Sequence, residues 1–396
     1  MTRLGGIPLR LVADDWGTDV PSPPHDALTP AQRRSFLSTH PNSYLAVTRG
    51  PEDVDPGVSL TPEQLLNEGR VALDRLFDKG AFQPLRPEAF YAYRLEDEAH
   101  SQTGIICGVP ADGLRTGELR AHESVHGTRR DHLAKHLEVV GYQSSPVVVS
   151  HRADAAVARV LATATERDPL LHHEGDDDLN QTIWVMTSHE ADTVIEALKD
   201  DPLYVIDGHH RTGAAQTYFD DNDGEGPSRW LLAAIFLSDE MRNLAHHRIW
   251  FGDTPAGITL LEEVLESMGA RPIEGNIGVA LFDRADDEIA VHAGDNWYIV
   301  SLPIDFDAPV VAQLESSRLE EQLLPLLSGI VAYRPGSSPI GELADEAGES
   351  EGALFMLRPV TMDQLFEVAD AGQTMPAKTT YFAPKARSGL FVRPMV

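Results

Sequence analysis

The residues of this sequence best suited to chemistry stand in one short turn, Asp207-Gly208-His209-His210-Arg211. An apolar run precedes the turn and small residues follow it, which predicts a strand passing into a helix. Backbone N–H groups and the helix dipole converge at such a junction and favour an anion. Gly208 permits a tight turn, and the imidazoles and guanidinium supply positive hydrogen-bond donors. The turn predicts a phosphate site in which Asp207 holds a metal or orients a histidine; the alternative is a polar turn capped by Asp207.

A second candidate is the segment His122-Glu123-Ser124-Val125-His126, which fits the HExxH pattern of zinc hydrolases. In that pattern two helical imidazoles bind the metal and the Glu activates its water. Gly127 follows directly and tends to end a helix, and the flanking sequence lacks the apolar stripe of a buried metalloprotease helix. A zinc hydrolase is therefore a lesser alternative. A solvated helix start with incidental histidines explains the same residues.

Two stretches of the chain are locally basic. The first has a net charge of +2 and contains Arg115, Arg120, Arg129, Arg130 and Lys135 against Glu118, Glu123 and Asp131. The second, residues 371–396, has no acid and contains Lys378, Lys385, Arg387 and Arg393. The first stretch therefore suits an anion held near Glu123. If the second folds back over the 207–211 turn, Lys378 and Lys385 clamp the ligand; alternatively, these bases pair with acidic surface patches.

The chain as a whole is strongly acidic, with 62 Asp and Glu against 32 Lys and Arg and a net charge of −30. Such a surface repels nucleic-acid phosphates and anionic lipid, which disfavours nucleic acid and membrane as partners. A single cysteine, Cys107, cannot form an internal disulfide, and neither a signal peptide nor a long apolar run is visible. We expect a soluble cytoplasmic protein that binds a small phosphorylated molecule.

Helices and strands alternate along the centre of the chain. The patterns predict helices over 61–80, 129–141, 154–168 and 190–201, and strands over 89–97, 103–110, 146–151, 182–189, 204–207 and 230–239. Beyond them we expect a helix over 258–270, a hairpin over 288–302 and a helical stretch over 310–330. This order predicts an α/β (α+β) protein. The predicted parts are an N-terminal segment, 1–99, a core, 100–255, and a C-terminal α+β domain, 256–396.

The segment VIDGHHRTGAA resembles the DGHHR signature of a bacterial and archaeal family, domain of unknown function family 1015. The family's other motifs are matched in order by PSPPHD with HPNSYLAVTRGPE, GELRAHESV, YQSSPVVV, LAHHRIW and MPAKTTYFAPKARSGL. Motifs that agree in sequence along nearly the whole chain are more specific than any one alone. His25, Val125 and His132 stand where the family usually has Tyr, Thr and Arg.

The core is also similar to the ParB/sulfiredoxin fold, as kinases of free serine use it. This similarity runs through LRAHE, a helix, PVVV and VIDGHHRTGAA, with residues 152–203 between the last two. The resemblance implies a ParB/sulfiredoxin-like core in which Glu123 is the general base and Asp207 is a catalytic residue that places the metal. The residues implied to bind nucleotide phosphates are His122, Gly208, His209, His210 and Arg211, with Lys378 and Lys385 added from the basic tail.

The leading prediction is a phosphotransferase that uses Mg²⁺ and ATP or ADP to phosphorylate a small hydroxyl metabolite, with free serine as the first candidate. Phosphoryl transfer needs mainly positioned cations and a carboxylate near the attacking hydroxyl, which these residues supply. The alternative is a non-catalytic nucleotide-binding sensor or switch of ParB-like fold. The choice between ATP and ADP and the oligomeric state do not follow from the sequence.

Overall fold

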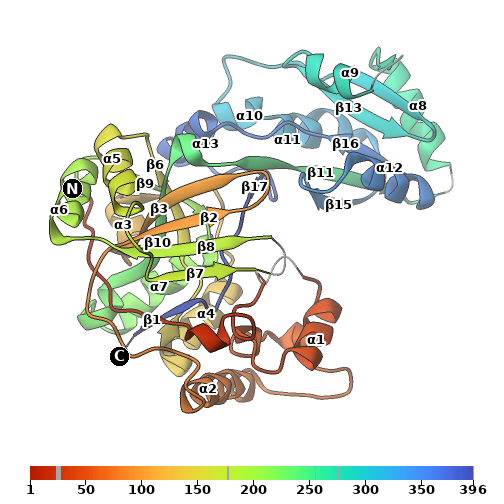
Figure 1. Ribbon diagram of the computed structural model, residues 1–396. Coiled ribbons are helices and arrows are strands. Elements are labelled where there is room, and N and C mark those ends of the chain that lie inside the picture. Colours follow the sequence, from red (N-terminus) through yellow and green to blue (C-terminus); the bar gives the residue numbers. More distant parts are fainter. Residues whose placement is uncertain (24–27, 176–177, 255, 274–276, 396) are drawn as a thin grey trace. The chain divides into compact units, whose positions relative to one another are not determined.

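The structure, a computed structural model, describes residues 1–23, 28–175, 178–254, 256–273 and 277–395. The chain forms two compact units: unit 1 comprises Met1–Met241 and Pro384–Val396, and unit 2 comprises Arg242–Ala383 (Figure 1). These units differ from the ranges 1–99, 100–255 and 256–396, because strands on both sides of residue 99 pair with each other and the last residues belong to unit 1. The division into functional domains stays a prediction.

Unit 1 alternates helices and strands, which confirms the predicted α/β class. Its helices are α1 (Pro30–Thr39), α2 (Pro62–Asp78), α3 (Gly113–Thr116), α4 (Gly127–Val140), α5 (Ala155–Ala164), α6 (Ser188–Leu198) and α7 (His209–Asp221). Its strands are β1 (Arg10–Leu11), β2 (Tyr91–Glu96), β3 (Ser101–Pro110), β4 (Leu119–Arg120), β5 (Tyr142–Gln143), β6 (Val147–His151), β7 (Leu171–Glu174), β8 (Asn180–Val185), β9 (Leu203–Asp207), β10 (Trp230–Leu237) and β18 (Phe391–Pro394). Short 3-10 helices occupy Asp14–Trp16, Tyr44–Ala46, Pro51–Asp53, Gly226–Arg229 and Ser238–Glu240.

Helix α2 shows how local sequence sets these elements. The Thr61 hydroxyl accepts a hydrogen bond from the Gln64 N–H, and the Gln64 side chain accepts one from the Thr61 N–H, so two donors of the helix start are satisfied. One face of the helix is buried and contains Leu65, Leu66, Gly69, Ala72, Leu73 and Leu76. Val71, an apolar residue of the same helix, is 65% exposed.

An eight-stranded sheet forms the centre of unit 1 in the part of the chain that the structure describes, in the order β4-β9-β6-β10-β3-β2-β8-β7. Successive side chains of a strand point to opposite faces. Tyr91 and Tyr93 of β2 therefore join one core cluster, together with α2, whereas Ala92 joins the other, together with α5 and α6. Both faces of the sheet are covered, so the strand ends are held in a rigid frame.

At one edge of this sheet β4 runs parallel to β9, with Leu119 opposite Leu203 and Arg120 opposite Tyr204. Parallel neighbours end at the same side of a sheet. The chain leaves β4 into residues 122–126 and leaves β9 into residues 208–211. The sheet thus brings together the two histidine-bearing segments that the sequence separates.

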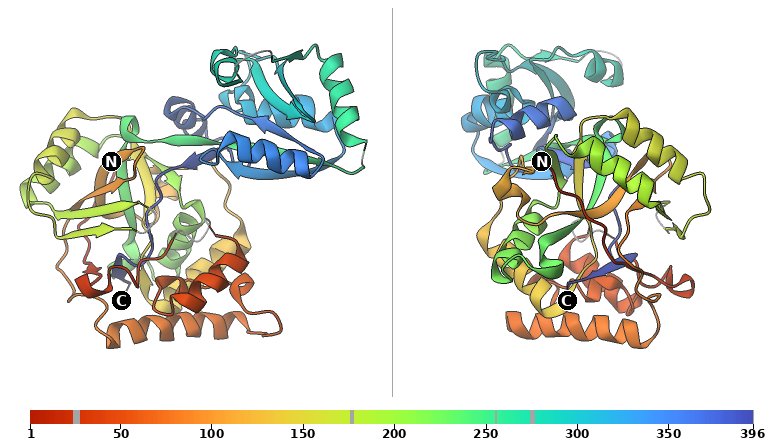
Figure 2. Two further views of the ribbon diagram at one scale, coloured as in Figure 1. Left: turned by 45° about the vertical axis from the view of Figure 1, so that its right-hand side comes forward. Right: turned by 90° about the vertical axis from the view of Figure 1, so that its left-hand side faces the viewer.

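The end of the chain is tied into unit 1 by β18, which pairs with β1 on one side and with β5 on the other. Figure 2 shows this blue terminal segment running back through unit 1. Arg393 is 1% exposed and donates to the Gln143 side chain and to the Trp230 and Pro227 carbonyls. The closing basic segment is therefore a built-in part of unit 1.

Unit 2 is an α+β unit. Its helices are α8 (Gly257–Ser267), α9 (Ile277–Asp283), α10 (Val310–Gln313), α11 (Glu315–Arg318), α12 (Ile340–Glu349) and α13 (Met362–Asp370). Its strands are β11 (Asn243–Gly252), β12 (Arg271–Pro272), β13 (Glu288–Ala293), β14 (Asn296–Ser301), β15 (Gly329–Pro335), β16 (Gly352–Met356) and β17 (Thr380–Phe382). The described strands follow the order β12-β14-β13-β16-β11-β15, and β17 also pairs with β11.

Two predictions for this part of the chain have different outcomes. The hairpin over 288–302 is confirmed as β13 and β14. The helical stretch over 310–330 is broken: α11 continues into a π-helix, Leu319–Leu323, then a 3-10 helix, Leu324–Leu326, and β15 starts at Gly329. Pro325 lies in the 3-10 helix and disfavours further helix beyond it, since proline lacks the N–H that a helix interior needs. Throughout the described residues, no helix combines the length and the apolar character required to cross a bilayer.

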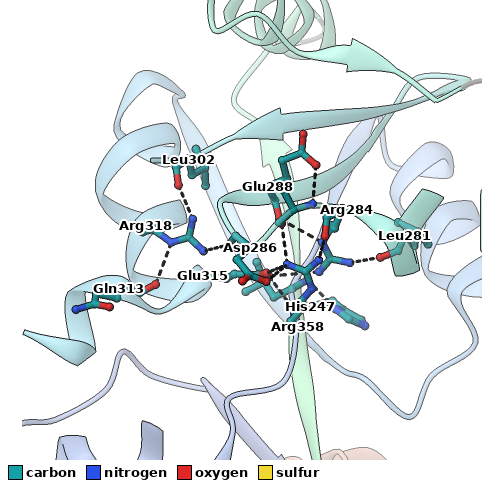
Figure 3. A network of polar contacts seen from close by, with 12 residues as sticks. His247, Leu281, Arg284, Asp286, Glu288, Leu302, Gln313, Glu315, Arg318 and Arg358 are labelled. Carbon is teal, nitrogen blue, oxygen red and sulfur yellow. Dashed lines mark hydrogen bonds and ion pairs between the residues drawn. The ribbon is translucent and has the colours of Figure 1, made fainter. Parts of the chain in front are cut away.

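A network of arginines around one buried carboxylate holds the loops of unit 2 together (Figure 3). Glu315 accepts from the Arg358 backbone N–H at 2.6 Å, from its guanidinium at 3.2 Å and from Arg284 at 3.4 Å. Arg284 also donates to the Leu281 and Glu288 carbonyls, and Arg318 donates to the carbonyls of Gln313, Leu302 and Asp286. Since backbone carbonyls take up most of these donors, we interpret the network as structural.

Replacement of the central carboxylate should destabilise unit 2. Glu315→Gln leaves the buried Arg284 without its counter-charge, which typically costs about 3–5 kcal/mol when one partner of a buried pair is removed. Glu263→Gln, on the exposed face of α8, is the matched control. Denaturant unfolding of both variants measures the difference; equal stability of the two would contradict a structural role for the network.

Candidate active site

The 207–211 turn lies where β9 ends and α7 begins, as the sequence predicts. Gly208 is the N-cap residue of α7 and has φ 96°, in the left-handed region that favours glycine. A Cβ built at Gly208 would also meet the Arg211 guanidinium at 2.9 Å. Glycine is therefore required here both for the backbone conformation and for the packing of Arg211 against the turn.

Asp207 is held between two cations. Lys385 Nζ lies 2.9 Å from Asp207 Oδ1, and Arg211 Nη2 lies 2.7 Å from Oδ2. Arg211 Nη1 also donates to the backbone carbonyls of Ser145, at 3.0 Å, and Pro146, at 2.7 Å. Both carboxylate oxygens are engaged, and one of the two partners comes from the C-terminal segment.

This arrangement keeps Asp207 ionised. Burial by itself would raise its pKa, but the charges of Lys385 and Arg211 and the hydrogen bond from Lys385 outweigh burial and hold the pKa well below the ordinary value. A carboxylate with so low a pKa is a poor proton acceptor at neutral pH. Asp207 is better suited to orienting the two cations than to acid–base chemistry.

The HESVH segment is not helical. Residues 122–126 form a bend and extended chain, and α4 begins only at Gly127. The two histidines therefore do not share one face of a helix, as the zinc hydrolase pattern requires. The prediction that Gly127 ends a helix is wrong, because Gly127 is the first residue of α4. Within the described ranges, no group of three or more His, Cys, Asp or Glu side chains is placed to hold a metal ion.

Each histidine of this segment meets a histidine of the turn. The rings of His122 and His209 pack edge to face with centroids 4.6 Å apart, and those of His126 and His210 stack with centroids 5.6 Å apart. The His126 backbone N–H donates to His210 Nε2 at 3.2 Å. A neutral His210 therefore carries its proton on Nδ1. The two candidate segments form one site.

The histidines at the centre of this site are neutral at neutral pH. Burial lowers the pKa of His209 to about 4 and lowers that of His122 well below its ordinary value. Burial also lowers the pKa of His210. The prediction that the imidazoles supply positive charge is therefore wrong: they are neutral hydrogen-bonding groups. The positive charge at the turn comes from Lys385 and Arg211. Direct phosphate binding by the histidines stays a prediction.

Glu123 has a different environment from Asp207. Its side chain is 47% exposed, and Oε2 lies 3.5 Å from His209 Nδ1. Because His209 is neutral, this contact does not compensate the carboxylate charge in the way that Lys385 compensates Asp207. The site thus holds two carboxylates in different environments, one fixed between cations and one near solvent.

The N-termini of α4 and α7 lie beside each other. His126, the N-cap residue of α4, contacts His210 in the first turn of α7. Gly213 permits the close approach, since a Cβ there would meet Val125 at 3.0 Å and Arg130 at 3.3 Å. Neither helix has a side-chain cap among the described residues. The first N–H groups of a helix favour an anion, so these two adjacent helix starts suit one.

Serines from three sequence motifs support the site. Ser22 and Ser388 exchange two backbone hydrogen bonds, and the hydroxyls of Ser145 and Ser388 are hydrogen-bonded. The Ser144 hydroxyl accepts from the Gly389 N–H at 2.6 Å. These serines are not among the predicted site residues, and the sequence signal that marks them is their place in motifs that occur in order along the chain. Residues 24–26 of the opening motif, His25 among them, lie outside the described residues.

The LAHHRIW motif and Lys378 belong to unit 2. Arg248 is fully buried and donates to the Lys378 and Ala377 carbonyls, with its guanidinium 4.6 Å from the centre of the Tyr333 ring. Lys378 has φ 55°, an uncommon conformation for a non-glycine residue. Within unit 2 this Lys378 loop is therefore fixed through its backbone. Phosphate binding by Lys378 stays a prediction.

A family model described as "Protein of unknown function (DUF1015)" matches residues 8–317. The chain belongs to this family. The DUF1015 match spans the HESVH segment, the 207–211 turn and LAHHRIW, and it ends before Lys385. No curated protein is a significant match to the chain.

Distant likenesses occur among solved structures. SbnI with C-terminal truncation from Staphylococcus aureus is 13% identical, with 73% of this chain and 87% of that chain covered and a TM-score of 0.39. A mutant free serine kinase in complex with ADP is 12% identical, with 72% and 92% covered and a TM-score of 0.37. A conserved hypothetical protein from Pyrococcus furiosus is 12% identical, with 72% and 95% covered and a TM-score of 0.35. These likenesses are too distant to assign an activity to this chain.

The neutral His209 predicts a pH dependence of stability. Its pKa in the folded chain, about 4, lies below the ordinary value of 6.5, so protonation favours the unfolded chain. The contribution of the neutral His209 ring to the free energy of unfolding is complete above pH 6.5 and is lost as the pH falls toward 4. Over this interval wild type should lose roughly 3 kcal/mol more unfolding free energy than His209→Gln.

Urea unfolding of both proteins between pH 7 and pH 4 measures this difference. His189→Gln is the matched control, since His189 is an exposed residue of α6. Equal pH slopes for wild type and His209→Gln would show that His209 is not held neutral.

Proposed function

We propose that this protein transfers a phosphoryl group from a nucleotide to the hydroxyl of a small metabolite, with free serine as the first candidate. The observation that carries the proposal is the arrangement around His209. Glu123 contacts its ring on one side, and the Asp207–Lys385–Arg211 cluster begins two residues before it in the chain. Phosphoryl transfer requires a carboxylate and fixed cations, and the contact of Glu123 with the His209 ring brings a carboxylate to the turn that holds Asp207 and Arg211.

The cations and helix ends suit the phosphates of the nucleotide. Lys385 and Arg211 are held by Asp207, and the uncapped starts of α7 and α4 lie beside each other. A lysine ammonium binds phosphate as a point charge, and helix N–H groups add hydrogen bonds. Positive groups placed in advance stabilise the transferred phosphoryl group without reorganisation during the reaction.

Glu123 is suited to the role of general base. It accepts the proton of the substrate hydroxyl while the hydroxyl oxygen attacks the terminal phosphorus of the nucleotide. The bond between that phosphorus and the rest of the nucleotide, which is the leaving group, breaks. A half-exposed carboxylate next to a neutral ring can take up that proton, whereas Asp207 is held ionised by two cations. The motif resemblance assigns the same role to Glu123.

A turnover assay with serine and either ATP or ADP, reading phosphoserine, tests the proposal. Loss of a general base typically costs about 10²–10⁴-fold, so Glu123→Gln should lower kcat by at least roughly 100-fold while nucleotide affinity is kept. Glu166→Gln, an exposed residue near the end of α5, should leave kcat unchanged.

The two outcomes that contradict catalysis differ from each other. Absence of product with either nucleotide, from folded protein that still binds nucleotide, would favour the alternative of a nucleotide-binding sensor or switch. Absence of both product and nucleotide binding would contradict the proposal that the turn is a phosphate site.

A further inference from the structure

The protein itself fills the cation position at Asp207. Lys385 Nζ and Arg211 Nη2 take up the two different oxygens of the carboxylate, at 2.9 and 2.7 Å. A carboxylate that ligates Mg²⁺ must bring an oxygen to about 2.0–2.1 Å from the ion. An ammonium group at hydrogen-bond distance from that oxygen repels a divalent cation. Asp207 as placed here does not fit the predicted role of metal ligand.

The other groups of the site do not provide a substitute for Asp207. Mg²⁺ prefers carboxylate, carbonyl and water oxygens, whereas imidazole suits transition metals. The remaining carboxylate, Glu123, has its Oε2 3.5 Å from His209 Nδ1. Where the chain is described, no group of three or more His, Cys, Asp or Glu is placed to hold a metal ion.

Lys385 is delivered to this position by the folding of the chain end. Three residues beyond it Ser388 pairs with Ser22, Gly389 donates to Ser144, and then β18 pairs with β1 and β5. The Lys385 side chain is 18% exposed. Its ammonium is therefore fixed at the turn by backbone pairing rather than by the Asp207 contact alone.

We propose that Lys385 replaces a divalent cation at Asp207: its ammonium keeps metal off this carboxylate and supplies the fixed positive charge for the ligand's phosphate. The second half of this inference rests on the proposed phosphate-binding function, and the first half does not. A nucleotide can bring Mg²⁺ on its own phosphate oxygens, but the protein's contribution at the turn is a lysine. Lys385 is thus a positioning and charge-compensating residue.

Titration with Mn²⁺ in the absence of nucleotide, followed by electron paramagnetic resonance, tests the exclusion of metal. Wild type should show no Mn²⁺ site at the turn. Lys385→Met should gain one site that binds at least roughly tenfold tighter than any site of wild type, since a repelling charge is removed. Adding Asp207→Asn to Lys385→Met should remove that site. Lys199→Met, which removes a partly exposed lysine at the end of α6 that pairs with Glu196, should behave as wild type.

Two results would overturn the inference. In the first, wild type and Lys385→Met bind Mn²⁺ with equal affinity at a site that Asp207→Asn removes. In the second, folded Lys385→Met gains no Mn²⁺ site. If Lys385→Met does not fold, Lys385→Gln provides the same readout, because its amide can still donate to Asp207 without a charge. The titration contains no nucleotide, so a failed kinase assay does not change its meaning. Conversely, an active kinase whose wild type holds Mn²⁺ on Asp207 would keep the proposed function and contradict the inference.

Discussion

The carboxylate of Asp207 and the two cations that fix it hold the candidate site together. Arg211 joins Asp207 to the Ser145 and Pro146 carbonyls, and Lys385 joins it to the end of the chain. An ionised carboxylate in a partly buried position is costly unless it is paired, and the paired cations are in turn held where an anion can reach them. One interaction therefore connects the β9 turn, the segment before β6 and the C-terminal segment.

The fold explains how distant segments reach this place. The parallel pairing of β4 and β9 brings residues 122–126 to the 207–211 turn, and β18 anchors the residues that follow Lys385. Because the net charge of the chain is −30, a local cluster of cations is stronger evidence for an anion site than it would be in a neutral chain. In a chain that repels anions on average, an anion site must be assembled locally from cations and helix N-termini. Arg211 and the starts of α4 and α7 lie within the residues that match the DUF1015 family, and Lys385 lies beyond them.

Much of this could be predicted from the sequence because it depends on local chemistry. The strand, glycine turn and helix at 204–221, the helix α2 and the α/β class follow from periodicity and from the residue types of the turn. The neutrality of His209 could not be predicted, because burial depends on the ring of His122 and on tertiary packing. Gly127 starts α4 rather than ending a helix, since glycine is compatible with both positions. The sequence could place Lys385 at the 207–211 turn only on the condition that the chain end folds back over it. No local pattern specifies where a chain end folds.

A crystal structure of the protein with ADP would show whether nucleotide phosphates bind at Lys385 and the start of α7. We expect phosphate oxygens within hydrogen-bond distance of Lys385 Nζ and of the first N–H groups of α7, with Lys385 still paired with Asp207. A nucleotide bound elsewhere, or a metal ion on Asp207 with Lys385 displaced, would contradict it.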